Sequence, residues 1–96
     1  MKQAINTIIE TVAAEFGVTT MALCGPTRAE IVAIPRMVAM ELIWRYCGTS
    51  YQTVATIFGK RYHGTVVHAR KRVNQMRETN KVFATTYRNI ESKINL

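Results

Sequence analysis

The sequence predicts an all-α protein, a compact domain of five or six helices spanning residues 1–96. Apolar residues recur every three to four positions in almost every segment, which is typical of amphipathic helices. No stretch of useful length alternates between apolar and polar residues as a half-buried strand would. A length of 96 residues fits one domain, and 48% hydrophobic with 20% charged residues is ordinary for a folded one.

Three helices are expected in the first half. The first covers about residues 2–16, and a short second one covers about 19–23 with Thr19 as its N-cap. Gly25-Pro26 then breaks the chain, so residues 27–29 are expected to form an exposed loop. The third helix ends near Cys47. Since proline fits best in a first helical turn, Pro35 indicates that this helix starts near Ile34 or bends there. Its apolar stripe is Val38, Ala39, Leu42, Ile43 and Tyr46.

The second half predicts three more helices. Ser50 caps a helix over about 51–58, residues 59–62 form a turn, and a longer helix covers about 63–78. This order of short helix, glycine-containing turn and longer helix is that of a helix-turn-helix over about 50–78. The last helix, about 80–94, has an apolar stripe that either completes the core or makes a dimer, so a monomer or weak dimer is expected.

The charge balance favours a polyanionic partner. Lysine and arginine number 13 against 6 glutamates, a net charge of +7 with a pI near 9.9. No acidic residue lies between Leu42 and Arg77, a segment that carries seven basic ones. Clustered cations in a basic domain are typical of nucleic-acid binding, whereas a general excess kept for solubility is the plainer alternative.

Several other classes are disfavoured. No apolar run is long enough for a membrane span, and Glu10 interrupts the N-terminal stretch too early for a secretory signal, so a cytoplasmic, nucleoid-associated protein is expected. Cys24 and Cys47 are expected to be reduced thiols. The spacing of the cysteines and histidines does not suit a zinc site, so no metal or cofactor is expected. No carboxylate pair or triad-like spacing indicates an enzyme, and no catalytic residue is assigned.

The helix over 63–78 has the features of a helix that reads a DNA groove. Its valines would anchor one side, and His63, Gly64 and Thr65 would form an exposed tip. Lys60 and Arg61 flank this tip, where the helix N-terminus also favours anions. For Arg70 and Lys71, further along the helix, a solvated helix face is an equally good interpretation.

The segment from Val54 to Ala69, VATIFGKRYHGTVVHA, resembles the signature of the C-terminal DNA-binding domain of the bacterial replication initiator DnaA. The upstream segment from Ala33 to Met40, AIPRMVAM, is similar to a second segment of that family. The resemblance implies the DnaA C-terminal, Trp-repressor-like fold and double-stranded DNA as partner. It implies that Arg28 enters the minor groove, that His63 contacts bases in the major groove, and that Arg36 lies near the DNA backbone. The DNA-binding residues expected on this basis are Arg28, Arg36, Ser50, Tyr51, Lys60, Arg61, Tyr62, His63, Gly64, Thr65 and His68.

Departures from the family pattern concern mainly the base-reading positions. Tyr62 stands where the family has an acid, Gly64 where it has serine or threonine, and Glu30 where it usually has arginine. A changed or weaker sequence preference is therefore expected. With no GxxxxGK[ST] loop, the chain is expected to be a stand-alone module without the family's ATPase module. It would regulate replication initiation or transcription by occupying sites. The alternative is a protein-interaction module that binds the host replication initiator, or another replication or transcription protein, without reading DNA specifically.

Overall fold

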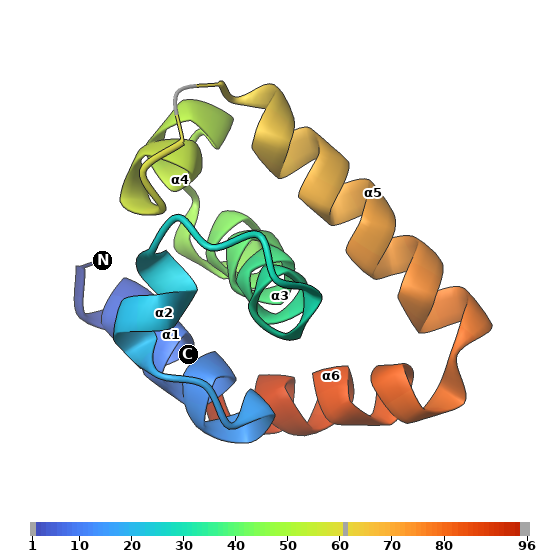
Figure 1. The fold of residues 1–96 in the computed structure, drawn as a ribbon. Coiled ribbons are helices and arrows are strands. Elements are labelled where there is room, and N and C mark those ends of the chain that lie inside the picture. Colours follow the sequence, from blue (N-terminus) through green and yellow to red (C-terminus); the bar gives the residue numbers. More distant parts are fainter. Residues whose placement is uncertain (1, 61, 95–96) are drawn as a thin grey trace.

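Six helices, of which α3 is central, make up the computed structural model, which describes residues 2–60 and 62–94. They are α1 (Lys2–Phe16), α2 (Thr20–Cys24), α3 (Glu30–Cys47), α4 (Tyr51–Ile57), α5 (Gly64–Thr79) and α6 (Lys81–Ile94). In Figure 1, α3 runs through the middle, with α1 and α2 at the left, α4 at the upper left, α5 along the right and α6 along the bottom. α3 packs against α1, α2, α4 and α5, while α6 joins α1 to α5. The all-α prediction is confirmed.

One apolar cluster fills the space between the helices, and every helix contributes to it. Its buried members are Ile8, Ile9, Val12, Ala13, Leu23, Val38, Ala39, Met40, Leu42, Ile43, Cys47, Val54, Ala55, Phe58, Val66, Ala69, Val73, Tyr87, Ile90 and Ile94. The stripes read from the sequence supply most of this cluster, because residues three and four apart share one face of a helix. The prediction that Tyr46 belongs to the apolar stripe of α3 is wrong, since its side chain is 46% exposed.

Two predicted helix caps are present. The amide of Ala22 donates to Oγ1 of Thr19 at 3.0 Å, and the amide of Thr53 donates to Oγ of Ser50 at 3.1 Å. Each bond satisfies an amide that the first helical turn leaves without a backbone partner. These caps explain why α2 and α4, although short, begin where they do.

Of the two alternatives that Pro35 indicated, a start of α3 near Ile34 is wrong. The helix begins at Glu30, upstream of Ile34, and Pro35 lies inside it. The amides of Val32 and Ala33 both donate to the carbonyl of Ala29, at 2.9 and 2.8 Å, so one turn is already closed before the proline. Within an established helix, proline removes a single backbone hydrogen bond, and the surrounding packing holds the helix together.

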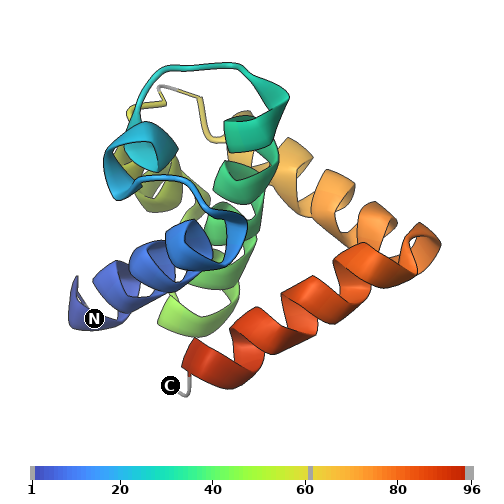
Figure 2. The same ribbon diagram turned by 60° about the horizontal axis from the view of Figure 1, so that its bottom comes forward.

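The apolar stripe of α6 is buried within this chain. Tyr87, Ile90 and Ile94 join the core, and Figure 2 shows α6 turning back from the end of α5 toward α1. On its outer side, Glu91 of α6 accepts a hydrogen bond from the hydroxyl of Tyr46. Of the two roles that the sequence left open for this helix, completion of the core is the one observed.

Neither a membrane-spanning helix nor a metal-binding cluster is present in the part of the chain that the structure describes. There, no helix has the length and apolar character needed to cross a bilayer. Nor do three or more His, Cys, Asp or Glu side chains in residues 2–60 and 62–94 come together as metal ligands would. Cys24 and Cys47 are both free thiols, and burial raises the pKa of each.

Replacement of Tyr87 by phenylalanine is expected to stabilise the protein. The side chain is 1% exposed, and its hydroxyl has no hydrogen-bond partner among the described residues. Burial, reinforced by the nearby Glu41 carboxylate, raises the pKa of this phenol. Since a buried unpaired hydroxyl carries a desolvation cost, Tyr87→Phe should raise the free energy of unfolding by about 1 kcal/mol in urea denaturation.

The matched control is Tyr87→Ala, which also removes the ring that lies 4.2 Å below the guanidinium carbon of Arg77. It should lower the free energy of unfolding by about 3 kcal/mol because it opens a cavity. A loss of stability in Tyr87→Phe would show that the hydroxyl is paired in solution.

Candidate nucleic-acid interface

The connection from α4 to α5 is fixed by its own backbone. The amide of Lys60 donates to the carbonyl of Ala55 at 2.9 Å, and the amide of Gly59 donates to that of Thr56 at 3.0 Å. Gly59 has a φ of +68°, a left-handed conformation that suits glycine because it has no Cβ. This pair of bonds is a Schellman motif, which ends α4 and directs the chain toward α5. The predicted helix-turn-helix at about 50–78 therefore corresponds to α4, this turn and α5.

One side of α5 is anchored and the opposite side is free. Val66, Ala69 and Val73 are buried, and α5 packs against α3, α4 and α6. Figure 1 shows α5 along the edge of the molecule, with only one flank covered. The exposed residues on its outer side include Val67, His68, Lys71 and Arg72. The buried side fixes the orientation of the helix, which leaves the polar side available to a partner.

A buried carboxylate holds α5 against α3. Glu41 of α3 is fully buried, and its Oε1 accepts a hydrogen bond from Nε of Arg70 at 2.9 Å. Its Oε2 accepts from Nδ2 of Asn74 at 3.2 Å, and Arg45 approaches Oε1 at 3.7 Å. Burial lowers the pKa of Arg70, but the hydrogen bond and charge of Glu41 outweigh it, so the net shift is upward. This arginine is therefore engaged in an ion pair within the molecule.

The same arginine also connects α5 to α4. Its guanidinium carbon lies 3.6 Å from the centre of the Trp44 ring, and its NH1 donates to the hydroxyl of Tyr51 at 2.9 Å. Trp44 and Tyr51 stack with ring centroids 5.5 Å apart. Tyr51, one of the DNA-binding residues expected from the resemblance, is half-buried and has its hydroxyl bonded to Arg70. Ser50, beside it, is exposed and caps α4.

The beginning of α5 is an exposed tip. Tyr62 is 67% exposed, His63 is exposed as the N-cap residue, and their ring centroids lie 5.0 Å apart. No side chain caps this helix and its first turn holds no acid, so the positive end of the helix dipole is left uncompensated. Gly64 and Thr65 are half-buried, as is Lys60 in the preceding turn. The predicted residue Arg61 lies outside the described residues.

The side chain of Arg36, on α3, holds the loop between α2 and α3 by hydrogen bonds. This side chain is 4% exposed, so the expectation that it lies near the DNA backbone is not matched by its position. Its Nε donates to the carbonyl of Leu23 at 2.7 Å, NH1 to that of Thr27 at 2.7 Å, and NH2 to that of Ala22 at 3.1 Å. Burial lowers its pKa. The guanidinium thus satisfies the carbonyls that end α2 and fixes the loop that carries Arg28.

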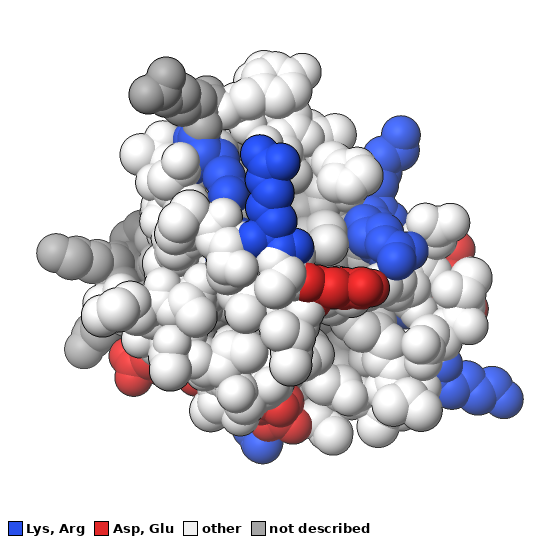
Figure 3. All heavy atoms as spheres, in the orientation of Figure 1, with Lys and Arg blue, Asp and Glu red and all other residues white. Residues whose placement is uncertain are grey.

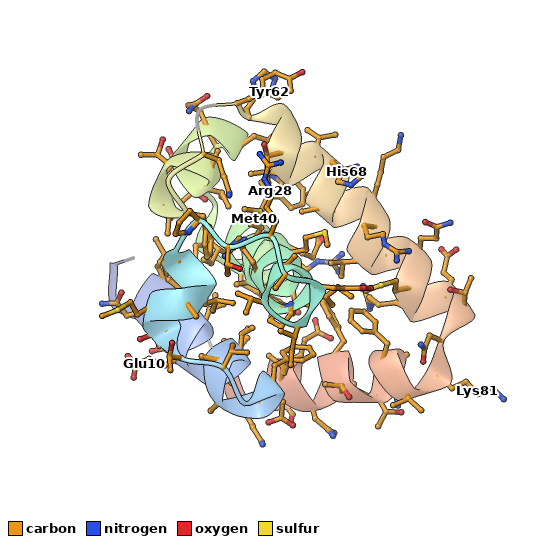
Figure 4. All side chains as sticks on the ribbon, in the orientation of Figure 1. Glu10, Arg28, Met40, Tyr62, His68 and Lys81 are labelled. Carbon is orange, nitrogen blue, oxygen red and sulfur yellow. The ribbon has the colours of Figure 1, made fainter. Side chains whose placement is uncertain are left out.

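The exposed residues of the loop and of α5 lie on one face. Figure 4 shows Arg28 in front of the space between α4 and α5. In the same view, Tyr62 lies at the start of α5 and His68 lies on α5 itself. Arg28 and His68 are both exposed. In the same orientation, Figure 3 shows basic side chains spread over this face from the loop to α5, with acidic atoms at one point between them. Segments far apart in the sequence are therefore brought together on one cationic surface.

Comparison with known families agrees with this arrangement. The sequence model of the family described as "Bacterial dnaA protein helix-turn-helix" matches residues 5–73, from α1 to most of α5. The chain belongs to this DnaA helix-turn-helix family. The match includes the Arg28 loop, Arg36, the turn after α4 and the tip of α5.

Individual DnaA proteins are similar over much of the chain. It is 34% identical to the chromosomal replication initiator protein DnaA of Acinetobacter baumannii strain AYE. The 87 aligned residues are 91% of this chain and 19% of that protein. The DnaA protein of Acinetobacter baylyi is 32% identical over 87 residues. That of Lactococcus lactis subsp. cremoris is 37% identical over 70 residues, which are 73% of this chain and 15% of that protein. The chain thus spans less than a fifth of the length of these relatives.

Sequence reasoning did not find the Glu41–Arg70 pair. Glu41 lies between buried residues of α3, with Met40 before it and Leu42 after it. A carboxylate within the apolar part of a helix must find a cation or a donor, and that signal was present in the sequence. The partner, 29 positions away, could not be identified without the packing of α5 on α3.

Loss of Arg70 is expected to destabilise this DnaA-family domain. Arg70→Ala would leave the buried Glu41 carboxylate without its closest cation, and breaking a buried ion pair in this way costs about 3 kcal/mol of unfolding free energy. Urea denaturation measures this loss. Lys71→Ala, at the next and exposed position, is the matched control and should change stability by less than about 0.5 kcal/mol.

The double variant Glu41→Leu with Arg70→Met tests the cause. It removes both charges while it keeps apolar volume, so it should be more stable than Arg70→Ala alone. Equal stability of Arg70→Ala and Lys71→Ala would show that the pair does not hold α5 in place.

Proposed function

We propose that this protein binds double-stranded DNA with a sequence preference and regulates replication initiation or transcription by occupying its sites. The observation that carries this proposal is the exposed tip of α5, where Tyr62 and His63 face solvent at the positive end of an anchored helix. A helix held on one side, with an exposed polar tip, is what a major groove accommodates.

In this mechanism, α5 enters the major groove by its tip. His63, the exposed N-cap residue, reads a base edge, and the helix N-terminus attracts a phosphate. The exposed cations of α5, Lys71 and Arg72, and the half-buried Lys60 in the turn contact the DNA backbone. These backbone contacts supply affinity that does not depend on sequence.

The loop between α2 and α3 provides a second contact. Arg28 is exposed beside α5, and Arg36 fixes the backbone that carries it. An arginine on a rigid loop next to a helix in the major groove is well placed for the adjacent minor groove, where the negative potential attracts it. Two grooves would then be read from one face of the protein.

The relatives support a role connected with replication. Those that match are named chromosomal replication initiators, and this chain corresponds to less than a fifth of each. We infer that the shared segment keeps the DNA partner, while the expected interaction with a host initiator is a further proposal. An action by site occupancy requires only the surface described above.

Selection of bound duplexes from a random pool, repeated at two salt concentrations, tests this function. A base preference that is enriched at both concentrations, with weaker binding in high salt, is the expected result. If no sequence is enriched and binding does not respond to salt, the DNA-binding proposal is wrong, and capture of the initiator from nuclease-treated lysate would favour the protein-interaction alternative.

Replacement of His63 by alanine separates base reading from general attraction. Because His63 is exposed at the tip, His63→Ala should leave folding intact and weaken binding to a selected site about tenfold. Binding to random-sequence DNA should change much less, as measured by fluorescence anisotropy. Equal losses on both kinds of DNA would remove the base-reading role of this residue.

Arg28 and Arg36 should differ in the salt dependence of binding. Arg28→Gln should weaken binding to all sequences and lower the slope of log Kobs against log salt by about 1, because an exposed cation that releases counterions is lost. Arg36→Gln should weaken binding through a looser loop with the slope unchanged, since its guanidinium is bonded to three carbonyls. Circular dichroism shows that each variant is folded. A lower slope for Arg36→Gln would place Arg36 on the phosphates instead.

A further inference from the structure

The ring of Tyr62 lies over the backbone of Gly64. A Cβ atom on Gly64 would clash with Cε2 of Tyr62 and would lie 2.5 Å from Cζ and 2.8 Å from Cδ2. These distances are shorter than any real contact of a Cβ atom. The ring therefore occupies the space that a side chain at residue 64 would need, and such a side chain would displace it.

The aromatic ring at this tip is not used by the core. Tyr62 is 67% exposed, compared with 46% for Tyr46, and its ring is tilted by 57° against that of His63. Its carbonyl accepts from the amide of Thr65 at 3.1 Å, which ties its backbone to the first turn of α5. An exposed ring whose backbone is held at the end of a helix is available to a partner.

We propose that Tyr62 is a specificity-determining residue that takes the place of a side chain at position 64. Its ring covers the spot on the helix tip that such a side chain would occupy, so it would meet the base pair next to the one read by His63. This inference rests on the proposed function, since it assigns a second base contact to the same DNA-binding surface.

The chemistry of the ring indicates which base it would select. Most of its surface is apolar carbon, and in the major groove the C5 methyl group of thymine is the apolar feature that a ring can contact. The hydroxyl can donate or accept a hydrogen bond, so it tolerates either neighbouring base edge. A preference for thymine at one position of the target is therefore expected.

A double-mutant cycle on Tyr62 and Gly64 tests the inference. The variants Tyr62→Ala, Gly64→Ser and the combination are measured on the selected site, on the same site with the thymine replaced, and on random DNA. Tyr62→Ala should lose about tenfold on the selected site and abolish discrimination at that one base pair, with little change on random DNA.

The two substitutions should not be additive. Gly64→Ser alone displaces the ring and should lose about as much affinity as Tyr62→Ala, whereas the same serine added to Tyr62→Ala should cost little more. Tyr62→Phe, which keeps the ring carbons, should keep the thymine preference. Tyr46→Ala, the same type of change at a tyrosine of α3 that is 46% exposed, is the matched control and should keep the preference unchanged.

Failure of the inference can be told from failure of the proposed function. If the unaltered protein enriches no sequence, the proposed function is wrong and the inference falls with it. If the unaltered protein has a preference that Tyr62→Ala retains in full, or if the losses in the cycle are additive, the role of Tyr62 is overturned while the proposed function stands. Thermal unfolding of each variant, expected to be near that of the unaltered protein, excludes misfolding as the cause.

Discussion

The carboxylate of Glu41 sits in the middle of the core, where a charge without a partner would cost several kcal/mol. Arg45 on the same helix approaches it at 3.7 Å, but the two side chains that donate hydrogen bonds to it, Arg70 and Asn74, both lie on α5. The carboxylate therefore constrains the distance and rotation of α5 relative to α3. Through Trp44 and Tyr51 the same arginine extends this constraint to α4. Together with the buried Val66, Ala69 and Val73, this polar arrangement determines which side of α5 faces solvent.

A second polar anchor, also on α3, determines the position of the loop that follows α2. Arg36 donates to the carbonyls of Ala22, Leu23 and Thr27, so it bonds both the end of α2 and the loop itself. The two anchors explain how a loop and a helix that are distant in the sequence reach one face (Figures 3 and 4). α3 serves as the common support for both elements, and its own apolar residues keep it in the core.

Much of the fold could be predicted, because helical spacing and capping are local properties. The apolar sides of α1, α4 and α6 and the caps Thr19 and Ser50 could be predicted from these local properties. The start of α3 could not be predicted. Backbone hydrogen bonds to the carbonyl of Ala29 begin the helix upstream, although proline is usually found in a first helical turn. In the candidate site, His63 is exposed at the tip, as expected. The burial of Arg36 and the hydrogen bond between Tyr51 and Arg70 were not expected. Both depend on partners far along the chain, which a local pattern does not reveal.

The separation between anchors and exposed residues has a consequence for how such proteins diversify. Arg36 and Glu41 are buried in α3, whereas Arg28, Tyr62 and His63 are exposed on the segments that these anchors hold. Changes at the exposed positions leave the supporting bonds intact, so they cost the scaffold little. A lineage can therefore acquire a new recognition repertoire by successive surface replacements, without passing through unfolded intermediates.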